Sequence, residues 1–130
     1  MAYRDEHHYN ETVLAHIAEP RNVGVIENPD AVGRGTNPVC GDEVTLYLRF
    51  EGEAVAEAKM EILGCGAITA AMSSLTDLVQ GKTAAQLQEL TAEAIAESVG
   101  GLPRHKRHCA QLAQRILRNA LADREARRTA

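Results

Sequence analysis

The chain has 130 residues, of which 45% are hydrophobic and 25% charged, a balance typical of a globular domain rather than a disordered chain. Its 14 basic and 18 acidic side chains leave a net charge of −4, which disfavours nucleic acid as a partner. No apolar stretch approaches the ~20 residues of a membrane helix, and the opening residues, MAYRDEHHYN, lack the apolar core of a secretory signal. We therefore expect a cytoplasmic protein without a membrane partner.

The first part of the chain predicts a helix followed by an irregular stretch. Tyr9 and Ile17 bound a run of apolar residues at helical spacing, and Pro20 ends that run. Residues 21–38 contain three glycines and two prolines, and they leave room for a short edge strand within 31–35.

Two strands and then a series of helices are predicted after this stretch. Apolar and polar residues alternate over 44–50 and again over 56–62, with Glu51-Gly52-Glu53 as the turn of a hairpin. From residue 66 onward the period becomes helical. We expect one α+β domain over residues 1–130 with its core between about 9 and 123. The predicted helices span 66–79, 83–90, 95–99 and 106–124, and the charged tail 124–130, including Arg124, Arg127 and Arg128, is expected to fray as a solvated end.

Three cysteines carry most of the functional information. An odd number of cysteines without a secretion signal argues against a disulfide framework, so each is a buried thiol, a reactive thiol or a metal ligand. Cys40 lies in a Pro/Gly turn, Cys65 stands between two glycines at a predicted strand-to-helix junction, and Cys109 begins the last predicted helix. A thiol at a helix N-terminus is favoured as thiolate, the form that binds metals and attacks sulfur.

Two further side chains are candidate ligands. Asp42 lies two residues after Cys40, so in an extended segment both side chains point the same way. His108 immediately precedes Cys109. Three thiols, one carboxylate and one imidazole are five candidates for a centre that needs about four. There is no CxxC motif and no Walker, Rossmann or Ser-His-Asp signature, which disfavours the corresponding enzymes.

The ordered cysteine motifs resemble those of the IscU and NifU N-terminal family of iron–sulfur cluster assembly scaffolds. The resemblance extends from about residue 9 to about 123. The matching segments are Glu19-Pro20-Arg21-Asn22-Val23-Gly24, Asn37-Pro38-Val39-Cys40-Gly41-Asp42, Gly64-Cys65-Gly66-Ala67-Ile68, Leu75-Thr76-Asp77-Leu78-Val79-Gln80-Gly81-Lys82-Thr83 and Leu102-Pro103-Arg104-His105-Lys106-Arg107-His108-Cys109.

The resemblance implies a fold, a function and a set of site residues. The fold is a small IscU/SufE-like α+β fold, with helices on a three-stranded antiparallel sheet. The function is a scaffold or carrier rather than an enzyme: it accepts persulfide sulfur from a cysteine desulfurase, binds Fe²⁺, builds a transient [2Fe–2S] cluster and passes it to iron–sulfur apo-proteins. Some members bind Zn²⁺ at the same position. The residues implied are Cys40, Asp42, Cys65, His108 and Cys109, with Cys109 and then Cys65 as persulfide acceptors and Asp42 or His108 as the fourth ligand.

One segment departs from the family pattern. Family members carry Leu-Pro-Pro-Val-Lys before the His-Cys pair, a segment that their Hsp70-type chaperone recognises. Here it reads Leu102-Pro103-Arg104-His105-Lys106, which puts recognition by such a chaperone in doubt. The further cluster-binding domains of NifU are also expected to be absent.

Other functions compete with the scaffold reading. A zinc-bound SufU-type sulfur acceptor would take sulfur without building a cluster, but such proteins have an insertion between the second and third cysteines and lack the histidine that is His108 here. A regulator of the desulfurase would carry no sulfur at all. A structural domain with three core thiols would leave the ordered motifs unexplained.

Overall fold

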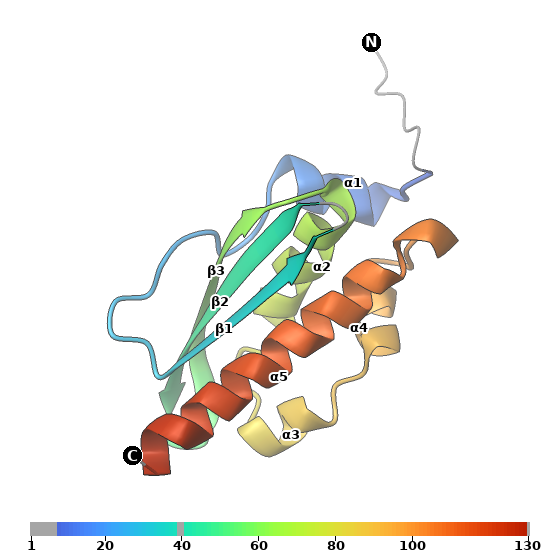
Figure 1. Ribbon diagram of the computed structural model, residues 1–130. Helices are drawn as coiled ribbons and strands as arrows, with labels where there is room; N and C mark the ends of the chain where they lie inside the picture. The colour runs from blue at the N-terminus through green and yellow to red at the C-terminus, as the bar shows by residue number, and fades with distance from the viewer. Residues whose placement is uncertain (1–7, 39–40, 130) are drawn as a thin grey trace.

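The computed structural model describes residues 8–38 and 41–129, which form a three-stranded antiparallel sheet with its helices packed mainly on one face (Figure 1). This confirms the predicted α+β architecture. In chain order the elements are α1 (Glu11–Ala18), β1 (Ala31–Asn37), β2 (Asp42–Glu51), β3 (Ala54–Leu63), α2 (Gly66–Leu78), α3 (Ala84–Gln88), α4 (Ala92–Ser98), the 3₁₀ turn η1 (Arg104–Lys106) and α5 (His108–Thr129).

The sheet has one buried and one solvated face because its strands alternate apolar and polar residues. Strand β2 pairs with both neighbours, and the register places Val44 opposite Ile62 and Leu46 opposite Met60. On the outer face, the Tyr47 hydroxyl donates to Glu61 at 2.5 Å. The core between the sheet and the helices consists almost entirely of aliphatic residues, as the scarcity of aromatic residues requires.

Helix α5 lies along β1, and glycines in that strand make the close packing possible (Figure 1). A Cβ on Gly35 would lie 2.5 Å from Cγ1 of Ile116, and a Cβ on Gly33 would lie 2.7 Å from the Ala120 backbone nitrogen. The predicted edge strand at 31–35 is therefore real, and it continues to Asn37. Glycines in a sequence usually indicate a loop, but in this strand they leave the space in which α5 packs closely against β1.

The segment after α1 covers the open edge of β3. Asn22 adopts a positive φ of 57°, its carbonyl accepts from the Met60 N–H, and the Gly24 N–H donates to the Met60 carbonyl, each at 2.8 Å. The Asn22 side chain donates to Asp77 in α2, and the Arg21 guanidinium donates to the same carboxylate. Two of the sequence motifs quoted above, residues 19–24 and 75–83, therefore bind each other and protect a sheet edge.

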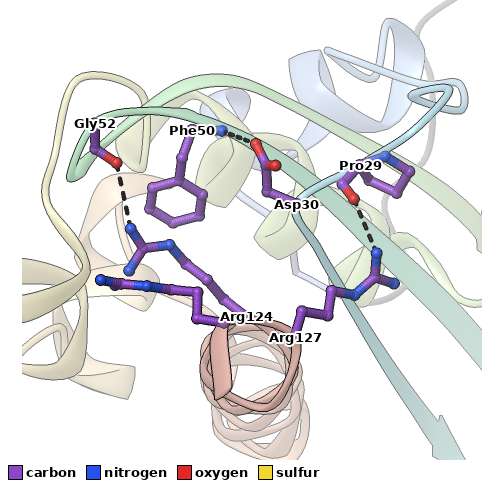
Figure 2. A pocket seen from close by; sticks show the side chains of 7 residues that line it. Pro29, Asp30, Phe50, Gly52, Arg124 and Arg127 are labelled. Carbon is purple, nitrogen blue, oxygen red and sulfur yellow. Dashed lines mark hydrogen bonds between the residues drawn. The ribbon is translucent and has the colours of Figure 1, made fainter. Parts of the chain in front are cut away.

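The C-terminal end of the chain differs from the prediction. Helix α5 continues to Thr129 and does not fray after residue 123. The prediction of a solvated arginine cluster was wrong for Arg124, which is 5% exposed. Its guanidinium lies over the Phe50 ring, 4.1 Å from the centroid, and donates to the Gly52 carbonyl (Figure 2). Arg127 donates to the Pro29 carbonyl at 2.9 Å, so this end of the helix is fastened to the β2–β3 turn and to the segment before β1.

Within the described residues, no helix combines the length and the apolar character needed to cross a membrane.

We expect Arg124→Ala to lower the free energy of unfolding by about 2 kcal/mol, because it removes a buried cation–π contact and a hydrogen bond. Urea denaturation followed by circular dichroism measures this. Arg128→Ala is the matched control: Arg128 is half exposed and makes only surface ion pairs, so its change should stay within about 0.5 kcal/mol. Equal effects of the two substitutions would show that the Phe50 contact is not stabilising.

Candidate functional site

The candidate site forms where the starts of β2, α2 and α5 meet. Asp42 is the first residue of β2, Cys65 is the N-cap of α2, and Cys109 is the second residue of α5. The β2–β3 register explains why the first two meet: Glu43 pairs with Leu63, so the end of β3 delivers the Gly64-Cys65 segment beside Asp42. Cys65 and Cys109 both lie at the start of a helix, as expected from the sequence.

The Asp42 carboxylate fastens this junction. It is 1% exposed, and its Oδ1 accepts the backbone N–H of Cys65 at 2.9 Å. Its other oxygen, Oδ2, lies 3.9 Å from Cys65 Sγ. The side chain of Cys65, the N-cap residue of α2, makes no capping hydrogen bond. Asp42 supplies the capping interaction instead, from the start of β2.

Glycine is needed on both sides of Cys65. A Cβ on Gly64 would lie 2.7 Å from Oδ1 of Asp42 and 2.7 Å from Ile68, so any side chain there would push the carboxylate away. A Cβ on Gly66 would lie 2.7 Å from Ile17 of α1. The Gly-Cys-Gly motif is thus a consequence of close packing around the thiol.

The two described thiols are adjacent. Cys65 Sγ and Cys109 Sγ are 4.0 Å apart, and His108 Nε2 lies 3.6 Å from Cys109 Sγ. Cys109 is fully buried, Cys65 is half-buried and His108 is exposed. The site therefore meets solvent at Cys65 and at the imidazole, with the second sulfur lying beneath.

Proton sharing makes the two thiols unequal. A hydrogen bond from the Cys109 thiol lowers the pKa of Cys65 to about 5 despite its burial, helped by the Ile68 backbone N–H at the start of α2 and by the charge of Lys106. The same hydrogen bond, together with burial, raises the pKa of Cys109. Sharing the proton therefore favours the thiolate form of Cys65 and the thiol form of Cys109.

The structure brings together four of the five candidates named from the sequence: Asp42, Cys65, His108 and Cys109. Cys40 lies outside the described residues, so its place in the site stays a prediction. Within residues 8–38 and 41–129, no three His, Cys, Asp or Glu side chains already converge to hold a metal ion. The four side chains instead form a series of pairwise contacts, which supplies soft thiolate donors beside one carboxylate and one imidazole.

Sequence reasoning missed two contributors. Lys106 had been noted only as part of the segment before His108, yet its charge favours the Cys65 thiolate. The sequence shows Gly64 only as a neighbour of Cys65, whereas in the structure it makes room for a carboxylate from another strand. Neither role has a local signal, because both depend on elements distant in the sequence.

Comparison with known proteins identifies the family of the chain. The model of the NifU-like N-terminal domain matches residues 8–130. The chain belongs to this family. It is 42% identical over 115 residues to "Iron-sulfur cluster assembly scaffold protein IscU 1" of Archaeoglobus fulgidus, covering 88% of this chain and 75% of that protein.

Solved structures of NifU-like proteins share the fold. The N-terminal part of a NifU-like protein from Brucella abortus superposes with a TM-score of 0.75 at 20% identity, over 90% of this chain and 94% of that one. A candidate iron–sulfur cluster assembly scaffold protein for the SUF system from Fervidobacterium islandicum gives a TM-score of 0.71 at 27% identity, over 87% of this chain and 96% of that one. These likenesses confirm the fold expected for the family.

Thiol labelling tests the inequality of the two cysteines. We expect iodoacetamide to modify Cys65 in metal-free protein almost as fast at pH 6.5 as at pH 8.5, because a thiol with a lowered pKa is already ionised in that range. An ordinary thiol would slow about tenfold for each pH unit below its pKa. The three cysteines fall in separate tryptic peptides, 35–49, 60–82 and 108–115, so mass spectrometry reads each rate.

In Cys109→Ala the hydrogen-bond donor is lost, and the labelling profile of Cys65 should move to higher pH. A Cys65 profile that is unchanged in this variant would contradict proton sharing between the two sulfurs.

Proposed function

We propose that this chain is a scaffold for iron–sulfur cluster assembly and not a turnover enzyme. The observation that carries the proposal is the pair of sulfurs 4.0 Å apart, next to a buried carboxylate, in a chain that belongs to the NifU-like family. The name of its 42% identical relative from Archaeoglobus supports the same role. Thiolates suit both tasks of such a scaffold, since they accept sulfur and bind iron.

The first proposed step is the acceptance of sulfur from a cysteine desulfurase as a persulfide. Cys65 is the group in place for it, because its sulfur is only half-buried and its pKa is lowered, whereas the sulfur of Cys109 is fully covered. Acceptance first by Cys109, the order implied by the family resemblance, requires the site to open.

The second proposed step is the binding of Fe²⁺ and the assembly of a transient [2Fe–2S] cluster as cargo. Cys40, Cys65 and Cys109 would supply thiolates, and Asp42 or His108 the fourth ligand. Asp42 touches Cys65 and His108 touches Cys109, so each is adjacent to a proposed ligand. A carboxylate binds such a cluster more weakly than a thiolate does, which favours later transfer to an apo-protein. Zn²⁺ is the alternative occupant of the same donors.

The proposed partners are a cysteine desulfurase and the apo-proteins that receive the cluster. An Hsp70-type chaperone is a doubtful partner. Arg104 and His105, which replace the family's Pro and Val, are both exposed in the η1 turn, so the surface that such a chaperone would bind is changed.

Thiols that can be oxidised are stable in a reducing compartment, which supports a cytoplasmic location for this protein.

Anaerobic reconstitution tests the proposed function. Apo-protein is mixed with Fe²⁺, cysteine and a catalytic amount of desulfurase, and visible absorption is followed while bound iron, sulfide and zinc are counted. We expect charge-transfer bands with equal iron and sulfide, and their loss in the variant with Cys40, Cys65 and Cys109 all changed to Ser. Tight zinc with a persulfide but no cluster would indicate a sulfur acceptor of the SufU type instead. Desulfurase binding by the triple variant, with no sulfur carried by either protein, would indicate a regulator.

Substitution of Asp42 tests whether this carboxylate is the weakly bound ligand that allows the cluster to be transferred. We expect Asp42→Ala to slow cluster transfer to an apo-ferredoxin by about tenfold, because removing a weak oxygen ligand and its charge leaves a cluster held by sulfur. Asp42→Asn is the matched control for the fold, since its carbonyl can still accept the Cys65 N–H. Transfer rates equal to wild type in both variants would exclude this role.

A further inference from the structure

The sulfurs of Cys65 and Cys109 lie close enough together to make the pair a candidate for disulfide formation. A disulfide needs its sulfurs about 2.05 Å apart, and these lie at 4.0 Å with either atom able to donate to the other. Each cysteine sits at the start of a helix, and both helices are packed on the same core. Each sulfur moves on rotation about its own Cα–Cβ bond, which is the torsion that disulfide formation would use.

We propose that this pair converts a persulfide on Cys65 into free sulfide by forming the Cys65–Cys109 disulfide. This rests on the proposed function, in which the chain accepts persulfide sulfur. The reaction is Cys65–S–S⁻ plus Cys109–SH giving Cys65–S–S–Cys109 plus HS⁻. The bond between the two persulfide sulfurs breaks, the bond between the cysteines forms, and the proton of Cys109 leaves with the sulfide. The outer sulfur gains two electrons, and the two cysteine sulfurs together lose them, so no external reductant enters this step.

Burial decides which persulfide sulfur is attacked. Cys109 is fully covered and approaches Cys65 from inside the protein, whereas the exposed part of Cys65 faces solvent. A sulfur added to Cys65 therefore extends outward, and Cys109 meets the inner sulfur first. Attack there releases sulfide, whereas attack on the outer sulfur would only pass the persulfide to Cys109. His108 Nε2, 3.6 Å from Cys109 Sγ, is placed to accept the proton of Cys109 as its sulfur attacks and to pass that proton to the departing sulfide.

This step gives the scaffold a defined stoichiometry. One pair supplies the electrons for one sulfide, and the disulfide must be reduced before the next. A cluster with two sulfides thus needs two rounds, each reset by a two-electron donor such as a dithiol. While the disulfide is present, Cys65 and Cys109 cannot bind iron as thiolates, so sulfide release precedes full ligation.

The experiment follows metal-free persulfidated protein after the sulfur donor has been removed. The protein is loaded anaerobically with cysteine and desulfurase, desalted without thiols, and sampled over time. Sulfide is measured colorimetrically, and persulfides and disulfides by mass spectrometry after alkylation. We expect one sulfide and one crosslink between peptides 60–82 and 108–115 for each persulfide lost from Cys65. Loading with inorganic polysulfide runs in parallel, so a failure of the desulfurase to donate sulfur would count against the proposed function alone.

Matched variants make the result decisive. In Cys109→Ala the persulfide on Cys65 should persist, with sulfide release slowed at least about tenfold, because a neighbouring thiol at high effective concentration has been removed. Arg128→Ala, near the other end of α5 from Cys109, should release sulfide as wild type does. Migration of the persulfide to peptide 108–115 without sulfide, equal release from wild type and Cys109→Ala, or a crosslink to peptide 35–49 would each overturn the proposal. The crosslink in wild type is read directly, so it stands even if a variant folds poorly.

Discussion

The hydrogen bond from the Cys65 backbone N–H to the Asp42 carboxylate is the contact on which the site depends. It joins the first residue of β2 to the N-cap of α2, and it exists because Gly64 leaves space for the carboxylate. Without it a helix N-terminus would be left uncapped, and the thiol would lose its fixed position. The same contact brings an acidic group next to a proposed sulfur ligand, where in the proposed function it would weaken the hold on a cluster.

Helix α5 sets the other half of the site. Its backbone lies against the glycines of β1, and its far end is fastened by Arg124 over Phe50. A helix held along this length delivers Cys109 to a defined depth beneath Cys65. The result is a fully buried sulfur on Cys109 next to a half-buried sulfur on Cys65, and in the proposed function the second of these would face the sulfur donor. The contact of Arg124 with Phe50 at one end of α5 thus helps to hold Cys109 in place at the other end.

Most of the fold was predictable from periodicity, because each strand and helix buries one face. The exceptions share a cause. The last helix was expected to end near Arg124, since a charged tail is usually solvated, but a ring on another strand covers that guanidinium. The sequence did not predict that the segment around Asn22 covers the edge of β3, because its hydrogen-bond partners lie in α2 and β3, far along the chain. In the site, the ordered motifs pointed to side chains of which the structure places Asp42, Cys65, His108 and Cys109 side by side. The function of Gly64 and the inequality of the two thiols required the contacts between elements.

The most direct test of this account is Mössbauer spectroscopy of the ⁵⁷Fe-loaded protein, with Asp42→Ala alongside. If Asp42 is the fourth ligand in a site built on Cys40, Cys65 and Cys109, the two irons of a [2Fe–2S] cluster are inequivalent. We predict two distinct ferric signals in wild type, of which the signal from the oxygen-ligated iron changes in the variant. Two identical all-thiolate irons, or a wild-type spectrum that Asp42→Ala leaves untouched, would contradict the central place given to this carboxylate.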